Sequence, residues 1–567
     1  MKVKENIITA LLSSVFTAIL IVVVYRCSQF RLDFKEQTGI FLWTSERIAW
    51  YLSNPAFLTS IAGDWLTQFF TGGISAMIII VAVLALLCCG VRKLGKRLQL
   101  EGSMSLVLFV AFLELTFLKF PNYPLAQTLG LVLVTWAAYG LTFVGNDRIR
   151  SVAFAVSIPV MYVLAGSYTT FLALVLCLID RRKPVRGISL ALAGLLAMVI
   201  LGRLYNLTFS QTMLYPVLQN YIVPDCRIIL LQPVFIIISL VLKERIWYAL
   251  SYGIISVFIC KADDRSLEHA VKTGTYAYQG QWDKIRSMKD KEITGNPYWL
   301  YYRNLSYAIE GRLPDRLLSV EQNRISEGLF LNTAKNSSYL ASMYNVDALI
   351  EAGDLSQATD CALLAQTVLP GHYSSRMLRK LAEISVIAGD YAVAGKYLDI
   401  LAQTWGHHAW AENMRNCIGR DSIPLEYLIL RDRASDSDRM FSQYDMNGSL
   451  NSIVKDNPLN KVAVDYLLCM CLLEKRMNSF IAGYDRYYLN GLDQLVEVPA
   501  LYQEALMAPV NSDESFRETV EKYHLSQAVV EKYFDFQKAR ERENIPQEYM
   551  NTYWFYLMST DFSRFRK

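Results

Sequence analysis

The sequence lacks the short motifs of the best-known catalytic sites. It has no glycine-rich phosphate loop ending in Gly-Lys-Ser or Gly-Lys-Thr and no Gly-x-Ser-x-Gly turn, so ATP-driven transport and serine hydrolysis have no support. Its ten cysteines include no Cys-x-x-Cys pair, which favours structural cysteine over a metal site. Cys469 and Cys471 are two residues apart and point to different faces of a helix, so no disulfide is expected between them.

Net positive charge and histidine are also scarce. The formal net charge is only +4, and no basic face with interleaved aromatic residues is present, so no nucleic-acid partner is expected. The adjacent His407 and His408 point apart on a helix, and His408 with Glu412 supplies only two ligands. We therefore predict no metal site, and a structural or surface role for the two histidines.

Apolar residues are abundant and unevenly distributed. The chain is 53% hydrophobic and 19% charged, too apolar for an ordinary soluble protein and too charged for a purely membranous one. Residues 1–260 contain long uncharged stretches, whereas residues 261–567 are charged throughout and hold all five histidines. We predict an all-α protein with a multi-pass transmembrane bundle over 1–260 and a water-soluble part after it.

Nine apolar segments predict helices that cross or enter the bilayer. The first has about 19 residues, which at 1.5 Å per residue nearly matches a hydrocarbon core of about 30 Å. It lacks a clear small-x-small cleavage site, so we interpret it as an uncleaved signal anchor. Several others are short enough to be re-entrant pieces within the bundle. The segments are Ile7–Tyr25, Gly73–Val91, Met104–Leu118, Leu125–Val144, Val152–Ala165, Tyr168–Ile179, Ile188–Leu204, Ile228–Leu242 and Ile246–Cys260.

The positions of Lys and Arg predict the orientation. Nine alternating segments, with a turn at Gly166-Ser167, place every basic cluster of the first half on one side, which the positive-inside rule makes cytoplasmic. An odd number of spans then leaves the second half outside. In a bacterium this arrangement predicts an inner-membrane protein with a cytoplasmic N-terminus and a periplasmic C-terminal domain. The clusters are Lys2 and Lys4, Arg92 to Arg97, Arg148 and Arg150, Arg181 to Arg186, and Lys243 with Arg245.

Residues 261–422 resemble tetratricopeptide repeats. Four glycines that follow helical patterns are 31 to 42 residues apart, which brackets the 34-residue period of that family. Small residues stand where two paired helices would approach closely, and a proline closes one unit. The glycines are Gly280, Gly311, Gly353 and Gly389, the small residues are Ala358, Ala382 and Ala394, and the proline is Pro370. Such arrays usually bind peptides or proteins, with a spacer or a stabilising cap as the alternative. Residues 423–567 are predicted to be further helices.

Ionisable residues gather on the predicted outer side of the membrane half. The outer loop over residues 26–72 alternates acids with aromatic residues and could lie in the interface. Glu114 lies inside an apolar segment, where an unpaired carboxylate is costly, so we expect it to pair with Arg203 or to line a polar cavity. The group comprises Asp33, Lys35, Glu36, Glu46, Asp64, Glu114, Lys119, Arg203, Asp225 and Arg227.

This arrangement resembles the membrane glycosyltransferases of the C superfold, which take sugars from lipid-phosphate carriers at the outer face. The resemblance implies that Glu36 or Asp33 acts as the base toward the acceptor, because an acid soon after the first span has that role in the family. It implies that Arg203 and Arg227 bind the carrier phosphate, as guanidinium groups bind it bidentately. Glu114 and Asp64 complete the predicted substrate-binding set. The alternative for each residue is that it only marks the end of a span.

The whole layout is also similar to an uncharacterised membrane family of Bacteroidota. The residues behind this similarity are Glu36-Gln37 and the stretch from Gly63-Asp64-Trp65 to Gln68 in the outer loop, followed by the multi-pass bundle and the repeat-like second half.

Two hypotheses of different classes follow. The first is a glycosyl- or oligosaccharyltransferase that uses a polyprenyl-phosphate-linked sugar at the periplasmic face, while the repeat domain recognises a protein or glycan acceptor. The second is a non-enzymatic membrane scaffold that binds envelope proteins through that domain. A solute transporter is disfavoured because no paired Gly/Pro-broken spans occur in two matching halves. The sequence defines no cofactor.

Overall fold

Helices make up the regular structure of the chain, and no strand occurs among the residues that the computed structural model describes. These are residues 2–180, 183–217, 231–263, 265–332, 339–369, 373–435, 445–491, 497–510, 512–542 and 545–559. The chain divides into two compact units. The first unit comprises residues 1–271, 369–376 and 399–412, and the second comprises 272–368, 377–398 and 413–567.

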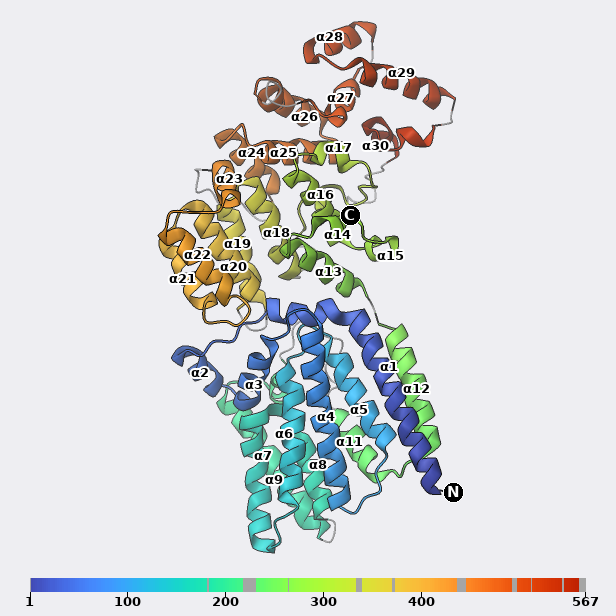
Figure 1. Cartoon of the computed structure of the whole chain (residues 1–567), viewed down its shortest axis with the longest axis vertical. Helices are drawn as coiled ribbons and strands as arrows, with labels where there is room; N and C mark the ends of the chain where they lie inside the picture. The colour runs from blue at the N-terminus through green and yellow to red at the C-terminus, as the bar shows by residue number, and fades with distance from the viewer. Residues whose placement is uncertain are drawn as a thin grey trace. The chain divides into compact units, whose positions relative to one another are not determined.

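The first unit is a bundle of apolar helices with short helices at one end (Figure 1). Its helices are α1 (Lys2–Gln37), α2 (Ser45–Leu52), α3 (Phe57–Thr67), α4 (Ile74–Arg97), α5 (Met104–Leu118), α6 (Leu125–Leu141), α7 (Asp147–Ala165), η1 (Gly166–Tyr168), α8 (Thr169–Ile179), α9 (Pro184–Leu204), α10 (Phe209–Leu214), α11 (Gln232–Val241), α12 (Ile246–Lys261) and the start of α13 (Ser266–Tyr278).

Small polar groups and close helix contacts hold the bundle together. Helix α1 packs along α5 and α12, where Ser13 and Ser105 share a hydrogen bond of 2.8 Å and Thr17 bonds the Tyr252 hydroxyl at 2.9 Å (Figure 1). In α6, a Cβ on Gly130 would lie 2.4 Å from the carbonyl oxygen of Ala165. Hydroxyls and glycines at helix contacts are typical of membrane bundles, in which close packing replaces the hydrophobic driving force.

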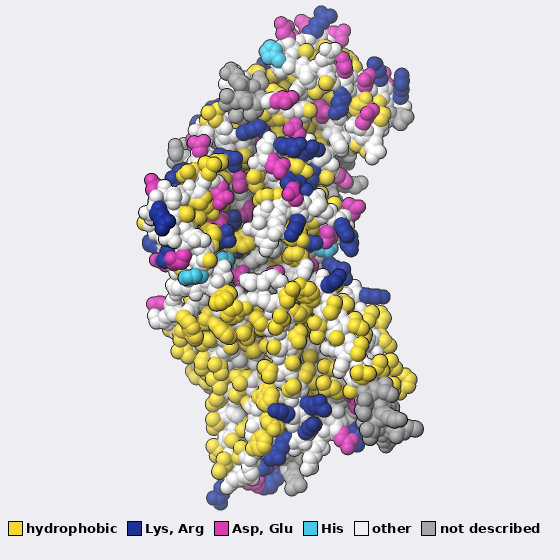
Figure 2. All heavy atoms as spheres, in the orientation of Figure 1, with side chains coloured by type: hydrophobic (Ala, Val, Ile, Leu, Met, Phe, Trp, Pro, Cys, Tyr) yellow, Lys and Arg dark blue, Asp and Glu magenta, His cyan; other side chains and the backbone are white. Residues whose placement is uncertain are grey.

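The surface of the first unit is largely apolar. Figure 2 shows hydrophobic side chains over the bundle helices and Lys and Arg side chains near the end where α4 terminates. The exposed apolar residues include Leu12, Val15 and Ile19 of α1 and Ile254 and Phe258 of α12. Exposed apolar area on this scale fits contact with lipid rather than water.

The number of helices able to cross a membrane is smaller than the nine predicted. Four described helical stretches are long and apolar enough to cross a membrane, namely Thr9–Gln37, Ile74–Arg97, Asp147–Ile179 and Pro184–Leu204. This test uses length and composition only, and the third stretch is made of α7 and α8, which form the hairpin described below. A fifth passes if Ile246–Lys261 and Ser266–Tyr278, bent by 58°, form one span. The prediction of about nine spans is therefore wrong, because α5, α6 and α11 have only 10 to 17 residues, which is short for a core of about 30 Å.

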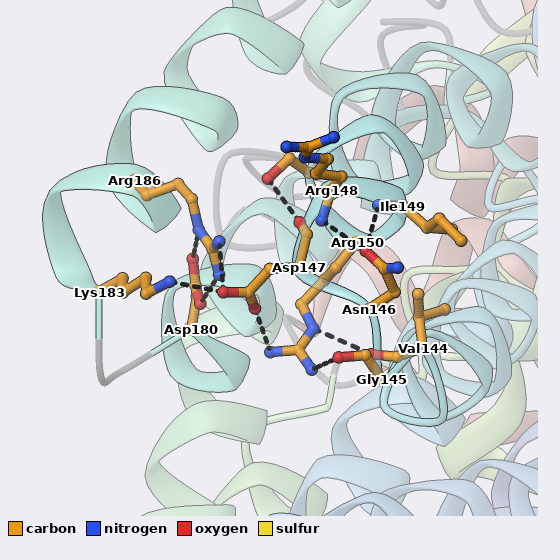
Figure 3. Close-up of polar contacts among 11 residues, drawn as sticks. Val144, Gly145, Asn146, Asp147, Arg148, Ile149, Arg150, Asp180, Lys183 and Arg186 are labelled. Carbon is orange, nitrogen blue, oxygen red and sulfur yellow. Dashed lines mark hydrogen bonds and ion pairs between the residues drawn. The ribbon is translucent and has the colours of Figure 1, made fainter.

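The stretch from α7 to α8 reverses direction at Gly166, as its sequence predicts. Gly166 has a φ of +80°, which favours glycine. Lys183, just after α8, lies 2.5 Å from Asp147 at the start of α7, and Figure 3 shows both beside Asp180 and Arg186. Two ends of a straight helix of 33 residues would be about 50 Å apart, so this contact requires a hairpin.

The predicted outer loop over residues 26–72 starts later than expected. Helix α1 continues without a break to Gln37, so residues 26–37 extend the first helix. The cause is a set of distant partners for the charges after Tyr25. Arg31, only 1% exposed, contacts Asp263 at 2.9 Å and Glu268 at 3.2 Å.

The second unit consists of helical hairpins joined by tight turns. The turns predicted at Gly280, Gly311, Gly353 and Gly389 are present, and all four glycines have a positive φ. Ala358, Ala382 and Ala394 are fully buried, as close packing of paired helices requires, whereas Pro370 lies outside the described residues. Cys469 and Cys471 are buried free thiols.

The helices of this half follow one another from the end of α13 to the C-terminal region. They are α14 (Trp282–Arg286), α15 (Asp290–Ile293), α16 (Pro297–Ile309), α17 (Leu313–Leu317), η3 (Ile325–Gly328), α18 (Tyr339–Ala352), α19 (Leu355–Val368), α20 (Ser375–Ala388), α21 (Tyr391–Leu401), α22 (His408–Gly419), α23 (Leu425–Arg433), α24 (Met446–Asp456), α25 (Lys461–Leu473), α26 (Met477–Gly483), η4 (Tyr484–Leu489), α27 (Ala500–Met507), α28 (Asp513–Tyr523), α29 (Gln527–Glu541), η6 (Gln547–Tyr549) and α30 (Tyr553–Ser559).

Candidate functional site

A cavity of about 360 Å³ lies in the first unit. Its walls come from the end of α1, from α2 and α3, from the loop between α5 and α6, and from the segments 369–376 and 399–412. Both polar and aromatic side chains line it. Two carboxylates from the predicted site, Glu36 and Asp64, both line this cavity although they belong to different helices.

Glu36 is fixed in the cavity wall by a histidine. Its Oε1 atom lies 3.1 Å from Nε2 of His407, and the two side chains are 13% and 8% exposed. The Ser375 hydroxyl donates to the backbone carbonyl of Glu36 at 2.9 Å, which anchors the end of α1. A carboxylate held by an imidazole and facing a cavity is suited to accept a proton from a bound hydroxyl group.

Asp64 is the second carboxylate of the cavity, and an aromatic cluster surrounds it. The Tyr51 hydroxyl donates to its Oδ2 atom at 2.5 Å, and Nη2 of Arg47 lies 3.7 Å from the same oxygen. The side chain of Asp64 keeps 38% of its surface exposed. Desolvation raises the pKa of Asp64, while the Tyr51 hydrogen bond and the Arg47 charge oppose that rise. The carboxylate is thus oriented yet accessible.

Arg47 connects this carboxylate to three aromatic rings. Its guanidinium lies 4.3 Å from the centroid of Trp50, 5.0 Å from that of Tyr51 and 5.5 Å from that of Tyr373. All four residues line the cavity. Aromatic rings beside hydrogen-bonding side chains suit a ligand that has both apolar and hydroxylated faces.

Gly63, directly before Asp64, allows α3 to approach the start of α6. A Cβ at this position would lie 2.6 Å from the backbone nitrogen of Ala126, closer than real Cβ atoms come. The Gly63-Asp64 pair of α3 therefore has a packing cause: the absence of a side chain at Gly63 lets α3 lie against α6, and the position of α3 in turn places Asp64.

We expect Gly63→Ala to destabilise the first unit by about 1–3 kcal/mol, because overpacking at a backbone contact forces the helices apart. Thermal unfolding of the purified full-length protein in detergent measures this. The matched control is Gly140→Ala in α6, where a Cβ has no neighbour within 4 Å; it should keep or slightly raise the melting temperature. Equal melting temperatures for the two variants would contradict the packing role of Gly63.

Lys35 also lines the cavity, with its ammonium group satisfied by backbone oxygens. Its Nζ atom donates to the carbonyls of Phe120 at 2.8 Å and Tyr123 at 2.5 Å, and the side chain is buried. The lysine thereby ties α1 to the loop that forms part of the cavity wall.

Asp33 and Glu114 have structural partners instead of cavity positions. Asp33 accepts a hydrogen bond from the backbone N–H of Gly73 and so holds the start of α4. Glu114 is fully buried and accepts hydrogen bonds from the hydroxyls of Tyr123 at 3.0 Å, Thr128 at 2.7 Å and Tyr168 at 2.7 Å. Of the two alternatives expected for Glu114, a pair with Arg203 or a place in a polar cavity, the structure shows neither: these three hydroxyls satisfy the carboxylate, and Glu114 does not line the cavity.

Of the two arginines predicted to bind phosphate, only Arg203 belongs to the described residues. Arg203 is exposed at the end of α9 and does not line the cavity. Arg227, together with Asp225, lies outside the described residues. In the part of the chain that the structure describes, no group of three or more His, Cys, Asp or Glu side chains is arranged to hold a metal ion.

A buried ionic network supports the end of α1 that presents Glu36. Lys119, at the end of α5, contacts Asp263 at 2.7 Å, and Asp263 also pairs with Arg31. Glu268 accepts further hydrogen bonds from the backbone N–H groups of Phe30 and Arg31, at 3.0 and 3.1 Å. The network joins α1, α5 and α13 within the first unit.

Sequence reasoning missed His407, Arg47 and Tyr51 as site residues. His407 was predicted to have a structural or surface role. It contacts Glu36, from which it is separated by 371 positions in the sequence. Only the neighbouring Trp405 and Trp410 hinted at a polar–aromatic site there. Arg47 and Tyr51 stand four apart in α2, on one helical face, a spacing that could have identified them with Asp64 as a cluster.

These features define the chain as an all-helical protein with several helices apolar enough to cross a membrane and a polar–aromatic cavity at the end of α1. It belongs to the DUF6057 family, a family of unknown function, which it matches over residues 4–560. No curated protein and no solved structure matches it.

Proposed function

We propose that this protein is a membrane glycosyl- or oligosaccharyltransferase that transfers sugar from a lipid-linked donor to an acceptor bound at the cavity. The observation that supports this most is the meeting of two carboxylates, Glu36 and Asp64, in one cavity lined by Trp50 and Tyr373. Aromatic faces stack on sugar rings, while carboxylates accept hydrogen bonds from sugar hydroxyls.

In the proposed reaction Glu36 is the general base. Its carboxylate accepts the proton of an acceptor hydroxyl as that oxygen forms a bond to the anomeric carbon of the donor sugar. The bond between this carbon and the carrier phosphate breaks, and the electron pair leaves with the phosphate. His407 holds the carboxylate in place through the 3.1 Å contact, and Asp64 orients sugar hydroxyls. A positioned base of this kind contributes about 10²–10⁴-fold to the rate.

The proposed location is a bacterial inner membrane with the cavity on the periplasmic side. Support comes from α4. Its N-terminus is hydrogen-bonded to Asp33, near the end of α1 that lines the cavity, and its last turn at the other end holds Lys96 and Arg97. Its 24 residues span about 36 Å, so the cavity end and the basic end are separated by roughly one bilayer. Basic residues collect on the cytoplasmic side. Helices that are too short to cross the bilayer can still lie at membrane depth, because the neighbouring helices of the bundle surround them.

The second unit is proposed to recognise the acceptor as a tetratricopeptide-like array. The support is its series of hairpins with positive-φ glycines at the turns and fully buried alanines between the helices. Stacked hairpins of this kind present extended surfaces to peptides and proteins.

The test compares lipid-linked and transferred glycans, by mass spectrometry of the envelope, between a parent strain and a strain that lacks the gene. Accumulated lipid-linked sugar with the corresponding glycan missing from protein or polymer is the expected result. An unchanged glycan profile would contradict the proposal.

The alternative function is a non-enzymatic scaffold for envelope proteins, favoured by the same hairpins. A full-length Glu36→Gln, Asp64→Asn double variant separates the two hypotheses, because a scaffold does not use the cavity carboxylates. Full complementation of the deletion strain by this variant would support the scaffold and contradict the transferase.

A further inference from the structure

The ends of α4 and α6 form a surface on which cations lie over aromatic rings. Nζ of Lys93 is 4.7 Å from the centroid of the Trp136 ring, and the guanidinium of Arg97 is 4.5 Å from that of Phe143. With two further exposed cations of α4 they make up the α4–α6 basic surface, which consists of Arg92, Lys93, Lys96, Arg97, Trp136 and Phe143.

The rings of this surface are fixed by their own packing. Tyr139 lies between them, with its centroid 6.0 Å from that of Trp136 and 5.1 Å from that of Phe143. The indole N–H of Trp136 donates to the Leu86 carbonyl at 3.2 Å, and Gly90 leaves room for the indole against α4. Phe143 is nevertheless 56% exposed. The cations therefore lie over a row of aromatic rings that pack on one another and stay partly exposed.

The cations of the α4–α6 basic surface have no carboxylate partner among the described residues, whereas nearby acids are neutralised elsewhere. Asp147 is contacted by Lys183 at 2.5 Å, Arg186 at 3.6 Å and Arg150 at 3.7 Å (Figure 3). Asp180 pairs with Arg186 through both carboxylate oxygens. The positive charge of α4 thus remains available to an external anion.

We propose that the α4–α6 basic surface binds the headgroup phosphate of anionic phospholipids. The surface borders the apolar band of the bundle, and Figure 2 shows dark-blue side chains next to the hydrophobic area there. Aromatic rings prefer the interface between hydrocarbon and water, and Lys and Arg beside them attract anionic lipid headgroups. The phosphate contacts Lys93 and Arg97 while the acyl chains lie along the neighbouring apolar helices. This inference is independent of the transferase proposal.

Native mass spectrometry of the purified full-length protein in detergent, titrated with phosphatidylglycerol or phosphatidylcholine, tests the proposal. We expect the wild type to retain phosphatidylglycerol preferentially. The Lys93→Gln, Arg97→Gln variant should bind it about 25-fold more weakly, since each basic residue near an anionic surface contributes about fivefold in affinity.

The matched control is Lys538→Gln, Arg540→Gln, which removes the same charge from α29 of the second unit and should leave lipid binding unchanged. The charge-preserving Lys93→Arg, Arg97→Lys variant should bind almost as tightly as the wild type. Equal binding by the Gln variant and the wild type would overturn the proposal, as would equal retention of the two lipids by the wild type. Competition by inorganic phosphate at the concentration of the lipid would also overturn it, because the surface would then recognise a free ion.

Discussion

Glu36→Gln is expected to lower the initial rate of glycan transfer by about 10²–10⁴-fold, because the amide cannot accept the proton of the acceptor hydroxyl. The substitution keeps the shape of the side chain, and Gln can still hydrogen-bond His407 across the 3.1 Å contact. Folding and donor binding should therefore be preserved. Membranes of a deletion strain that expresses the variant, supplied with extracted lipid-linked glycan, provide the rate.

The control for this experiment is Glu46→Gln, which changes an exposed carboxylate in α2. It should transfer at the wild-type rate, since it does not line the cavity. A Glu36→Gln rate within threefold of the wild type, with equal protein in the membrane, would remove Glu36 from the mechanism. Such a result would leave the cavity as a binding site only.

Arg31→Ala is expected to be the most destabilising single substitution of the first unit. The arginine is 1% exposed and contacts two carboxylates, those of Asp263 and Glu268. Removing one partner of a buried ionic network leaves charge uncompensated and costs about 3–5 kcal/mol. Thermal unfolding of the purified protein in detergent should show a melting temperature several degrees below that of the wild type.

Arg203→Ala is the matched control, because that arginine is exposed at the end of α9. Its melting temperature should equal that of the wild type. Arg31→Lys should fall between the two, since an ammonium group keeps the charge but lacks the fork that reaches both carboxylates. An unchanged melting temperature for Arg31→Ala would show that the network contributes nothing to stability.

Much of the helical architecture can be predicted from local sequence. Apolar runs locate the bundle helices, and the glycines at 353 and 389 locate turns of the second unit, because both signals depend on neighbouring residues only. The length of α1 could not be predicted in this way. Its charged end is helical because Arg31 meets Asp263 and Glu268, more than 230 positions later.

The candidate site was predicted only in part for a similar reason. Glu36 and Asp64 were identified from charge in an aromatic segment, and the structure brings both to one cavity. Asp33 is an acid in the same segment as Glu36, but it accepts a hydrogen bond from the backbone of Gly73. Which of the two carboxylates meets α4 depends on how α1 packs against α4. His407 joins Glu36 from the segment 399–412, and nothing in the residues around His407 specifies that tertiary contact.

The activity proposed for the cavity is the transfer of sugar from a lipid-linked donor. It can be tested by reconstituting the purified full-length protein in liposomes with lipid-linked glycans extracted from the deletion strain, followed by mass spectrometry of donor and products. We expect the carrier to lose its glycan and an acceptor from the envelope to gain it. Recovery of all donor intact, with wild-type protein that is folded and supplied with envelope acceptors, would show that the protein is not a transferase of this kind.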